Sequence, residues 1–302
     1  MTDQIKKEAF RLGFSQCGIA LAKPLDELRP FYSHFLQQEK HAYLNYLKTN
    51  SEKRMDPSLV MPEAKSVITL TLNYFPAGVM PEEDNYIIAK YAYGNDYHQV
   101  VKDRLERLSN YLRKESGATQ VQSYVDSGPV SEKVWASLCG LGWQGKNTIL
   151  INKTSGSFFF IGILFTNLDL EPDPASTDHC GDCEKCVRAC PTGALDNPYQ
   201  LNILKCIAYQ TIENKAAIPE DIITHLEGRI YGCDKCQDVC PYNRFSKPNE
   251  IPEFIPSPAL FKMRKKDWDT LSKEQFDALF SNSPIRRIGY ERFKRNIEVA
   301  GN

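Results

Sequence analysis

Hydrophobic positions in the first 170 residues alternate between a helical period and strand-like runs. Ile5, Ala9 and Leu12 recur at helical spacing and predict an amphipathic helix at the N-terminus. The segment SVITLTLNY (66–74) is β-branched and apolar, which is typical of a buried strand. This alternation predicts an α/β or α+β domain built around a mixed sheet. The other expected elements are helices at 26–47, 98–115 and 131–138, strands at 14–21, 86–93 and 120–125, and a hairpin of 148–152 with 157–166.

Two proline-rich stretches divide the chain into three expected parts. EPDPAS (171–176) ends the first part, and a second stretch from Pro241 to Pro258 follows a region dense in cysteine. Two helices, 267–280 and 285–299, are expected to close the chain. The expected parts are an α/β domain at 1–170, a ferredoxin-like cysteine domain at 171–245, and a linker with a basic helical segment at 246–302.

The composition is that of an ordinary globular protein, with 42% hydrophobic and 25% charged residues and a formal charge of −1. The longest apolar run, SFFFIGILF (157–165), is far shorter than the roughly 20 residues of a membrane helix. The N-terminus lacks the apolar core of a signal peptide. Because the cytosol keeps thiols reduced, ten cysteines in such a chain argue for metal rather than disulfides. We therefore expect a cytoplasmic, metal-binding protein with no membrane partner.

Eight of the ten cysteines form two spaced motifs, each ending in Cys-Pro. The first spacing is typical of bacterial ferredoxins, in which the fourth cysteine ligates the other cluster. The second motif departs from the compact ferredoxin pattern, because 26 residues separate its first two cysteines. The motifs are Cys180-x2-Cys183-x2-Cys186-x3-Cys190-Pro191, and Cys206 followed by Cys233-x2-Cys236-x3-Cys240-Pro241.

The pseudo-twofold relation of the two motifs predicts a crossed set of ligands for two 4Fe–4S clusters. Zinc is the alternative, since Cys-x2-Cys pairs also build four-cysteine zinc sites. Zinc does not require three cysteines at this spacing with two Cys-Pro ends, so iron–sulfur is favoured. Cys17 and Cys139 lie outside the motifs and are expected to be buried, inert thiols. The expected ligands are Cys180, Cys183, Cys186 and Cys240 for cluster 1, and Cys190, Cys206, Cys233 and Cys236 for cluster 2.

A glycine-rich stretch, GLGWQG (140–145), formally matches the dinucleotide fingerprint G-x-G-x-x-G. That fingerprint follows a strand and opens a helix, whereas this one follows an expected helix and precedes an expected strand. Nicotinamide binding is therefore not favoured. We expect the glycines to let the backbone pass close to a large flat ligand, with Trp143 as a wall and Lys146 as a cationic contact.

Asp126 lies where an apolar segment ends, and its sequence context leaves two interpretations open. A carboxylate at a strand end facing a cavity can have a raised pKa and act as a general acid. Alternatively, Asp126 is a turn aspartate that caps the following helix. His98 belongs to Asp96-x-His98-x-x-Val101, which lacks the glycine of the cobalamin-binding D-x-H-x-x-G motif. A histidine ligand to cobalt is therefore not supported, and we expect His98 to be structural.

The segment 261–295 is basic, with ten Lys or Arg against five Asp or Glu. Its aromatic residues Trp268, Tyr290 and Phe293 are interleaved with the cations. A solvated helix face is the default explanation, but cations beside aromatics are also how proteins bind RNA backbone and splayed bases. The residues expected to contact RNA are Arg286, Arg287, Lys294 and Arg295.

Several stretches of sequence, together with the double cysteine motif, make the chain resemble the epoxyqueuosine reductase family over essentially its whole length. Longer members of that family carry an additional C-terminal helical-repeat domain, and this chain ends where that domain would begin. We therefore expect any RNA contact made by that domain to be absent or replaced. The other resembling stretches are RMDPSLVMPEAKSVI (54–68), KYAYGNDYH (90–98), YVDSGPVSEKVWASLCGLGWQGKNTILINKTSGSFFFIG (124–162) and SPIRRIGYERFKRNIEVAGN (283–302).

The resemblance implies a cobalamin-dependent enzyme, related to reductive dehalogenases, that performs the last step of queuosine synthesis on the wobble base of tRNA. It implies that Asp126 is the proton donor and that the loop 207–215 lies between cofactor and RNA. The expected partners are tRNA with epoxyqueuosine in its anticodon loop and an external electron donor, and the protein is expected to be a monomer. The residues implied near the corrin are Arg54, Tyr97, Asp126, Lys146, Asn147 and Ser157.

The implied chemistry fits the parts found in the sequence. Removing an epoxide oxygen to leave an alkene takes two electrons and two protons; the clusters deliver electrons singly, and cob(I)alamin is a nucleophile able to open the ring. Two alternatives remain. A reductive dehalogenase-like enzyme for a small molecule is disfavoured by the missing export signal and the basic C-terminus. A ferredoxin-type electron carrier would have no need of the large first domain.

Overall fold

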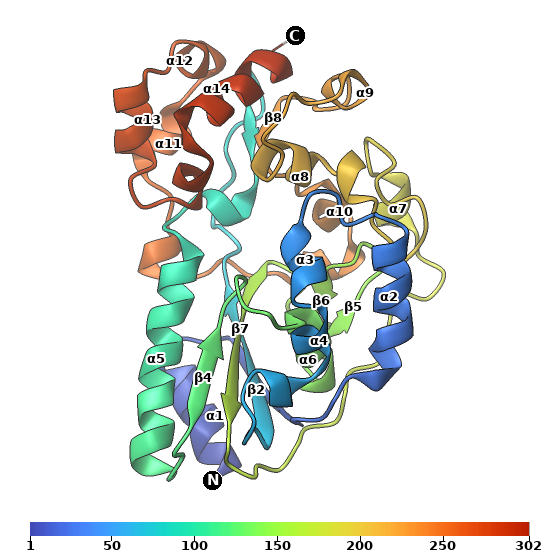
Figure 1. The fold of residues 1–302 in the computed structure, drawn as a ribbon. Helices are drawn as coiled ribbons and strands as arrows, with labels where there is room; N and C mark the ends of the chain where they lie inside the picture. Colours follow the sequence, from blue (N-terminus) through green and yellow to red (C-terminus); the bar gives the residue numbers. More distant parts are fainter. Residues whose placement is uncertain (302) are drawn as a thin grey trace.

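The computed structural model describes residues 1–301 (Figure 1). Four strands form the central sheet in the order β1 (Gln16–Leu21), β2 (Ser66–Asn73), β7 (Phe159–Thr166) and β4 (Val121–Tyr124). Every neighbouring pair in this sheet is antiparallel, so the expected α+β class is found but the mixed sheet is not. A parallel pair occurs elsewhere, between β3 (Ile87–Ile88) and β8 (Arg229–Tyr231). Side-chain alternation does not reveal strand direction, because both directions share the same period.

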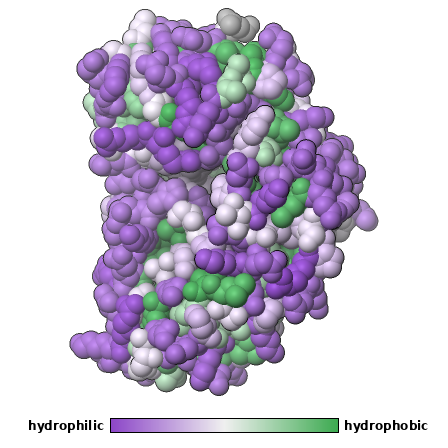
Figure 2. All heavy atoms as spheres, in the orientation of Figure 1, coloured by the Kyte–Doolittle hydropathy of each residue, from purple (hydrophilic) through white to green (hydrophobic). Residues whose placement is uncertain are grey.

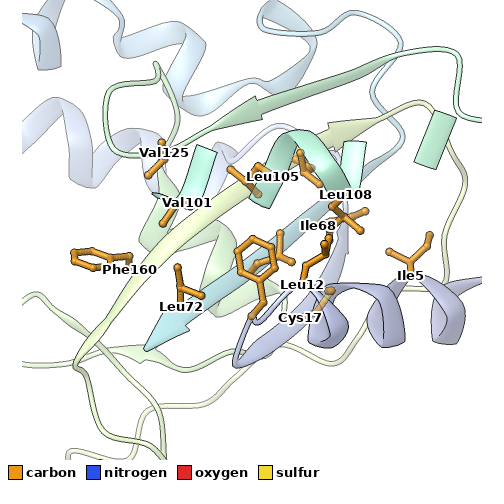
Figure 3. Close-up of a cluster of buried hydrophobic side chains, with 14 of the residues drawn as sticks. Ile5, Leu12, Cys17, Ile68, Leu72, Val101, Leu105, Leu108, Val125 and Phe160 are labelled. Atoms are coloured by element: carbon orange, nitrogen blue, oxygen red, sulfur yellow. The ribbon is translucent and has the colours of Figure 1, made fainter. Parts of the chain in front are cut away.

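Both faces of the central sheet are buried, which explains the continuous apolar run of β2. Ile68 and Leu164 contribute to a core beneath α1 (Thr2–Arg11) and α5 (Tyr97–Glu115). Val67 and Ile163, one position away, point to the opposite face, which is covered by α6 (Glu132–Leu138). Figure 3 shows the first core, with Ile5 of the predicted N-terminal helix packed toward the sheet.

Three expected elements differ from the structure. The helix at 26–47 is broken into α2 (Arg29–Gln37) and α3 (Asn45–Thr49), because Glu39 and Ala42 adopt positive φ angles of 52°, which an α-helix excludes. The strand at 86–93 is reduced to β3, followed by a 3₁₀ turn. The expected hairpin does not form, because β6 (Leu150–Ile151) pairs with β5 (Trp143–Gln144) while β7 pairs with β2 and β4.

The C-terminal segment packs against both other parts of the chain. Trp268, Phe276 and Phe293 form a core with Tyr86 from the first part and Tyr231 from the cysteine domain. In place of the two helices expected at 267–280 and 285–299, the structure has a larger number of shorter helices. The chain starts a new helix at residues that favour a helix N-terminus, such as the capping Ser272 and Pro284. The remaining helices are α4 (Ser51–Met55), α7 (Lys185–Arg188), α8 (Ile207–Ile212), α9 (Glu220–Ile223), α10 (Lys235–Asp238), α11 (Pro258–Lys262), α12 (Lys265–Asp269), α13 (Lys273–Leu279) and α14 (Gly289–Ala300).

The exterior is mainly hydrophilic, with hydrophobic residues gathered in small groups (Figure 2). Within residues 1–301, no helix combines the length and the apolar character needed to cross a bilayer. Cys17 and Cys139 are buried as expected, and burial raises the pKa of each thiol to about 12. Both are therefore protonated and unreactive at neutral pH.

Candidate active site and cluster sites

Four cysteines from both motifs surround one cavity of about 300 Å³. They are the four expected for cluster 1, including Cys240 from the second motif. Trp143 donates a hydrogen bond from Nε1 to Cys180 Sγ at 3.3 Å, and Lys146 and Lys185 line the same cavity. Donors and cations stabilise anionic sulfur, so this cavity fits a 4Fe–4S cluster. The cysteines that line the cavity are Cys180, Cys183, Cys186 and Cys240.

The other four cysteines lie near one another beside α8 and α10. Burial raises the pKa of Cys206, and the nearby Cys190 raises it further. Burial also raises the pKa of Cys233 to about 11, with Cys206 adding to the effect. Cys236 is surrounded in the same way by burial, Cys233 and Cys206. This second group matches the expected ligands of cluster 2, and the ligand sets themselves stay a prediction.

Trp143, expected to be a wall for a large flat ligand, is therefore bonded to Cys180, and Lys146, expected to be a cationic contact, lines the cysteine cavity. The glycine-rich stretch has a structural explanation as well. Gly142 has a φ of 152°, and a Cβ at this position would lie 2.3 Å from the carbonyl oxygen of Ile151. The glycine thus permits the close pairing of β5 with β6.

Asp126 is the centre of a hydrogen-bond network at the end of β4. Its backbone has a positive φ of 55°, and its carboxylate accepts a hydrogen bond from Tyr97 Oη at 2.6 Å. His98 Nε2 lies 3.2 Å from the same oxygen, Oδ2, and His98 Nδ1 lies 2.7 Å from Asp96 Oδ1. The Tyr97 ring is stacked on Phe160 of β7 with ring centroids 4.2 Å apart, which fixes its hydroxyl. The first turn of α5 and the loop after β4 therefore build this network together.

The protons of this network do not reside on Asp126. The Asp126 side chain is largely exposed, but the surrounding chain still removes some of its water, which favours a higher pKa; hydrogen bonds from His98 and Tyr97 outweigh this effect and lower the pKa. Burial favours a lower pKa for His98, but Asp126 and Asp96 outweigh burial and raise it to about 9. The expectation of a raised pKa at Asp126 is therefore wrong for this arrangement. His98, expected to be only structural, is the protonated member.

Glu132 is part of this site and was missed in the sequence. It is the first residue of α6, and its Oε1 accepts a hydrogen bond from the backbone N–H of Asp126 at 2.6 Å. Burial, followed by the nearby Asp126 carboxylate, raises the pKa of Glu132 to about 8. The Asp126 carboxylate itself contacts Tyr97 and His98, and Ser131 is the N-cap residue of α6. The helix-cap interpretation of Asp126 is therefore not what the structure shows.

A cavity of about 380 Å³ adjoins Asp126. Arg54 and Asp126 line it together with apolar side chains such as Phe35 and Val130. Arg54 donates from Nη1 to the carbonyl oxygen of Val130 at 2.9 Å, whereas its buried Nε has no hydrogen-bond partner within residues 1–301. This donor is left free to bond a water molecule or a polar group of a bound molecule.

The other expected cofactor contacts lie elsewhere around the site. Tyr97 reaches it through Asp126, and Lys146 lines the cysteine cavity. Asn147 and Ser157 are buried against the cysteine domain, where Ser157 Oγ lies 3.1 Å from Gln237 Nε2 and Asn147 Nδ2 lies 3.4 Å from the Cys236 carbonyl oxygen. These two side chains therefore attach the first part of the chain to the second, and a cofactor role for them stays a prediction.

The four basic residues expected to contact RNA do not form one free face. Arg287 pairs with Glu213 at 2.6 Å, and its charge is near enough to Asp126 to help lower the pKa of that carboxylate. Arg295 donates to three backbone carbonyls of the segment 210–216, and Lys294 donates to the carbonyl oxygen of Asp269. Arg286 bonds the nearby carbonyl oxygen of Ser281. Arg287 is thus the member that faces the site, and RNA contact by the others stays a prediction.

Comparison with known proteins assigns the family. Residues 54–127 match the family described as "Epoxyqueuosine reductase QueG, DUF1730", and residues 179–243 match the "4Fe-4S double cluster binding domain". The epoxyqueuosine reductase of Cellulophaga algicola is 44% identical over 98% of this chain and 97% of its own length. That of Escherichia coli is 34% identical over 99% of this chain and 80% of its own length.

Solved structures agree with these relatives. A selenomethionine-labelled epoxyqueuosine reductase superposes with a TM-score of 0.90 at 31% identity, over 99% of this chain and 80% of its own. An epoxyqueuosine reductase with a tRNA-Tyr epoxyqueuosine-modified stem loop gives 0.89 at 31% identity, with the same coverage. The chain therefore belongs to the epoxyqueuosine reductase family of oxidoreductases and carries a domain that binds two 4Fe–4S clusters.

Proposed function

We propose that this protein reduces epoxyqueuosine to queuosine at the wobble position of tRNA, in the cytoplasm and as a monomer. The epoxide takes up two electrons and two protons and leaves an alkene and water. The observation that carries the proposal is the proton-holding network around Asp126, which lines a cavity in a chain that also carries the two cysteine groups. An electron carrier alone has no need of such a network, and Arg287 beside it favours an RNA substrate over a small halogenated molecule.

Cobalamin is the cofactor we propose for the 380 Å³ cavity. The apolar lining suits a corrin ring, and the unpaired Arg54 Nε would meet one of its polar groups. The cavity would enclose only part of so large a molecule. When bound, cobalamin supplies a cobalt centre that opens the epoxide and passes on the electrons.

His98 and Asp126 divide the proton transfer between them in this proposal. The Asp126 side chain is 60% exposed and faces the cleft, whereas His98 is behind it and holds the proton. As negative charge develops on the epoxide oxygen, the Asp126 carboxylate takes the proton of His98 Nε2, 3.2 Å away, on its Oδ2 and passes it to that oxygen. Asp96 keeps the imidazole in place through Nδ1. Glu132 holds the Asp126 backbone and is a second protonated group at neutral pH.

Electrons enter at cluster 1 in this proposal and leave from cluster 2. Cys183 is exposed, whereas the other seven motif cysteines are less so, and an external donor would reach the cluster at this point. Cys206 lies at the start of α8, and Glu213, at the end of that helix, pairs with Arg287 beside the Asp126 site. We therefore place cluster 2 on the side of the reaction in this proposal.

The proposal is tested by anaerobic reconstitution with iron, sulfide and cobalamin, followed by incubation with a reductant and an epoxyqueuosine-containing tRNA stem-loop. We expect about eight irons per chain, up to one cobalamin, and a nucleoside product that has lost one oxygen atom by mass spectrometry. A fully loaded protein that leaves the epoxide intact would contradict the proposed reaction. Zinc in place of iron would contradict the electron path.

A further inference from the structure

Tyr43 has an unusually exposed aromatic side chain for this protein. Its exposed fraction is 79%, the highest among the large hydrophobic residues on the surface of residues 1–301, and Tyr46 three positions later is 52% exposed. Both belong to the segment 40–54, which contains α3 and whose first part was expected to end the helix at 26–47. Single exposed aromatics are common, so exposure alone identifies no site.

The charge of the same segment supplies a second observation. Residues 40–54 contain four Lys or Arg against one acidic residue, in a chain whose formal charge is −1. That acidic residue, Glu52, is paired with Arg29 at 2.7 Å. Lys48 and Lys53 form no ion pair within residues 1–301. Free cations interleaved with exposed aromatic rings are typical of surfaces that bind single-stranded nucleic acid.

The position of this segment joins it to the candidate active site. Tyr46 lines the same cavity as Arg54 and Asp126, and the Arg54 guanidinium lies 5.6 Å from the Tyr46 ring centroid. Tyr43 lies beside Tyr209 of α8, the helix that leads to the Glu213–Arg287 pair. Figure 1 shows α3 next to the cysteine domain, on the side of the molecule where α8 and α10 lie. The segment therefore borders the cleft that leads to Asp126.

We propose that the segment 40–54 binds the single-stranded loop of the RNA, with Tyr43 as a stacking platform for a base that neighbours the modified nucleotide. Lys48 and Lys53 contact the phosphates on either side of that base. This inference rests on the proposed function, because an RNA whose modified base reaches Asp126 must place its neighbouring nucleotides along the rim of the cleft. The segment 40–54 would then be an RNA-binding surface separate from the basic C-terminal segment.

The test compares the binding of two labelled RNAs by fluorescence anisotropy: a stem-loop with a single-stranded loop, and a fully paired duplex. Tyr43→Ala should bind the stem-loop about 5- to 150-fold more weakly, the loss expected for one base stacked on an aromatic ring. Duplex binding should be unchanged, since paired bases cannot stack on Tyr43. Tyr43→Phe should bind like the wild type, because stacking needs the ring and not the hydroxyl. Phe10→Ala, which removes a 51% exposed ring on α1, is the matched control.

The two RNAs and the turnover assay separate the stacking role of Tyr43 from other roles of this surface. Normal stem-loop binding by Tyr43→Ala, or equal weakening of stem-loop and duplex, would overturn the stacking role. A slower reduction of the clusters by a protein electron donor with unchanged RNA affinity would instead make this surface the donor's docking site. Turnover by wild-type protein is measured in parallel. If the wild type reduces the epoxide and Tyr43→Ala binds normally, only this inference fails, whereas a wild type that neither binds nor reduces the stem-loop contradicts the proposed function.

Discussion

Asp126 and His98 are 28 positions apart in the chain and meet through Oδ2 and Nε2 at 3.2 Å. The contact lowers the pKa of the carboxyl group and raises that of the imidazole to about 9, so the pair carries one proton, on the histidine. The carboxylate that faces the substrate therefore lies beside a protonated imidazole that can give it a proton. In this arrangement His98 holds the proton and Asp126 faces the substrate. A single aspartic acid with a raised pKa would show a different dependence of turnover on pH.

Asp126→Asn should reduce turnover by about 10²–10⁴-fold, because the amide has nearly the size of the acid but delivers no proton. Cluster content, cobalamin and RNA binding should persist, since within residues 1–301 the Asp126 side chain is hydrogen-bonded to Tyr97 and His98 and the substitution preserves its size. Single-turnover assays on fully loaded enzyme check this expectation. Near-normal turnover would reject Asp126 as the proton donor.

The His98 proton should make turnover fall at high pH, which is the basic limb of the pH–rate profile. His98 has a folded-state pKa raised to about 9, so the proton is present below that pH and is lost as pH rises through it. Turnover should therefore fall above pH 9, and His98→Gln should be slow at every pH and lack this limb. The same sign applies to stability: the ion pairs of His98 contribute fully below its unfolded pKa of about 6.5, and the contribution disappears as pH rises through about 9.

An independent measurement of the same property is the imidazole NMR signal of His98 in the protein without cobalamin. It should titrate near pH 9 in the wild type and at a lower pH in Asp126→Asn, because the substitution removes one anionic partner. A His98 signal that titrates near its ordinary value of about 6.5 in the wild type would remove the proton store from the mechanism.

The crossed ligand sets predict which cysteine variants behave alike. Cys180→Ser and Cys240→Ser should lose the same cluster signal in electron paramagnetic resonance, because both residues line one cavity. Cys190→Ser and Cys206→Ser should lose the other signal, and each variant should retain about four irons. If Cys240→Ser instead pairs with Cys206→Ser, each motif ligates its own cluster and the crossing is wrong.

Arg287 and Arg295 should respond differently to the same substitution. Arg287→Gln removes a charge near Asp126 and should weaken RNA binding and flatten its salt dependence, without loss of stability beyond a weak surface ion pair. Arg295→Gln should lower the free energy of unfolding by about 1–3 kcal/mol, because its guanidinium bonds the carbonyl oxygens of Gln210, Asn214 and Ala216. Anisotropy and urea unfolding of both variants distinguish the two roles, and an Arg295→Gln protein of normal stability with weakened RNA binding would reverse them.

The sequence by itself determined the features that depend on neighbouring residues. The spacing of Cys180, Cys183 and Cys186 specifies a loop that wraps a cluster, and that region matches a double-cluster domain. The helical period of Ile5, Ala9 and Leu12 and the apolar run at 66–74 specify α1 and β2. The breaks at Glu39 and Ala42 had no such local signal, because a positive φ at these residue types depends on what surrounds them.

Tertiary structure alone decided which distant residues meet. Tyr97 and His98 at the start of α5 reach Asp126 after β4 because both elements pack against β7, and Glu132 joins them from α6. Packing likewise brings Arg287 from the C-terminus to this site while it uses Arg295 to secure the segment 210–216. The two arginines sit in one basic stretch of sequence, and their side chains acquire different partners only when the chain is folded. A pKa follows those partners, so the location of the proton on His98 was beyond what residue types and spacing could specify.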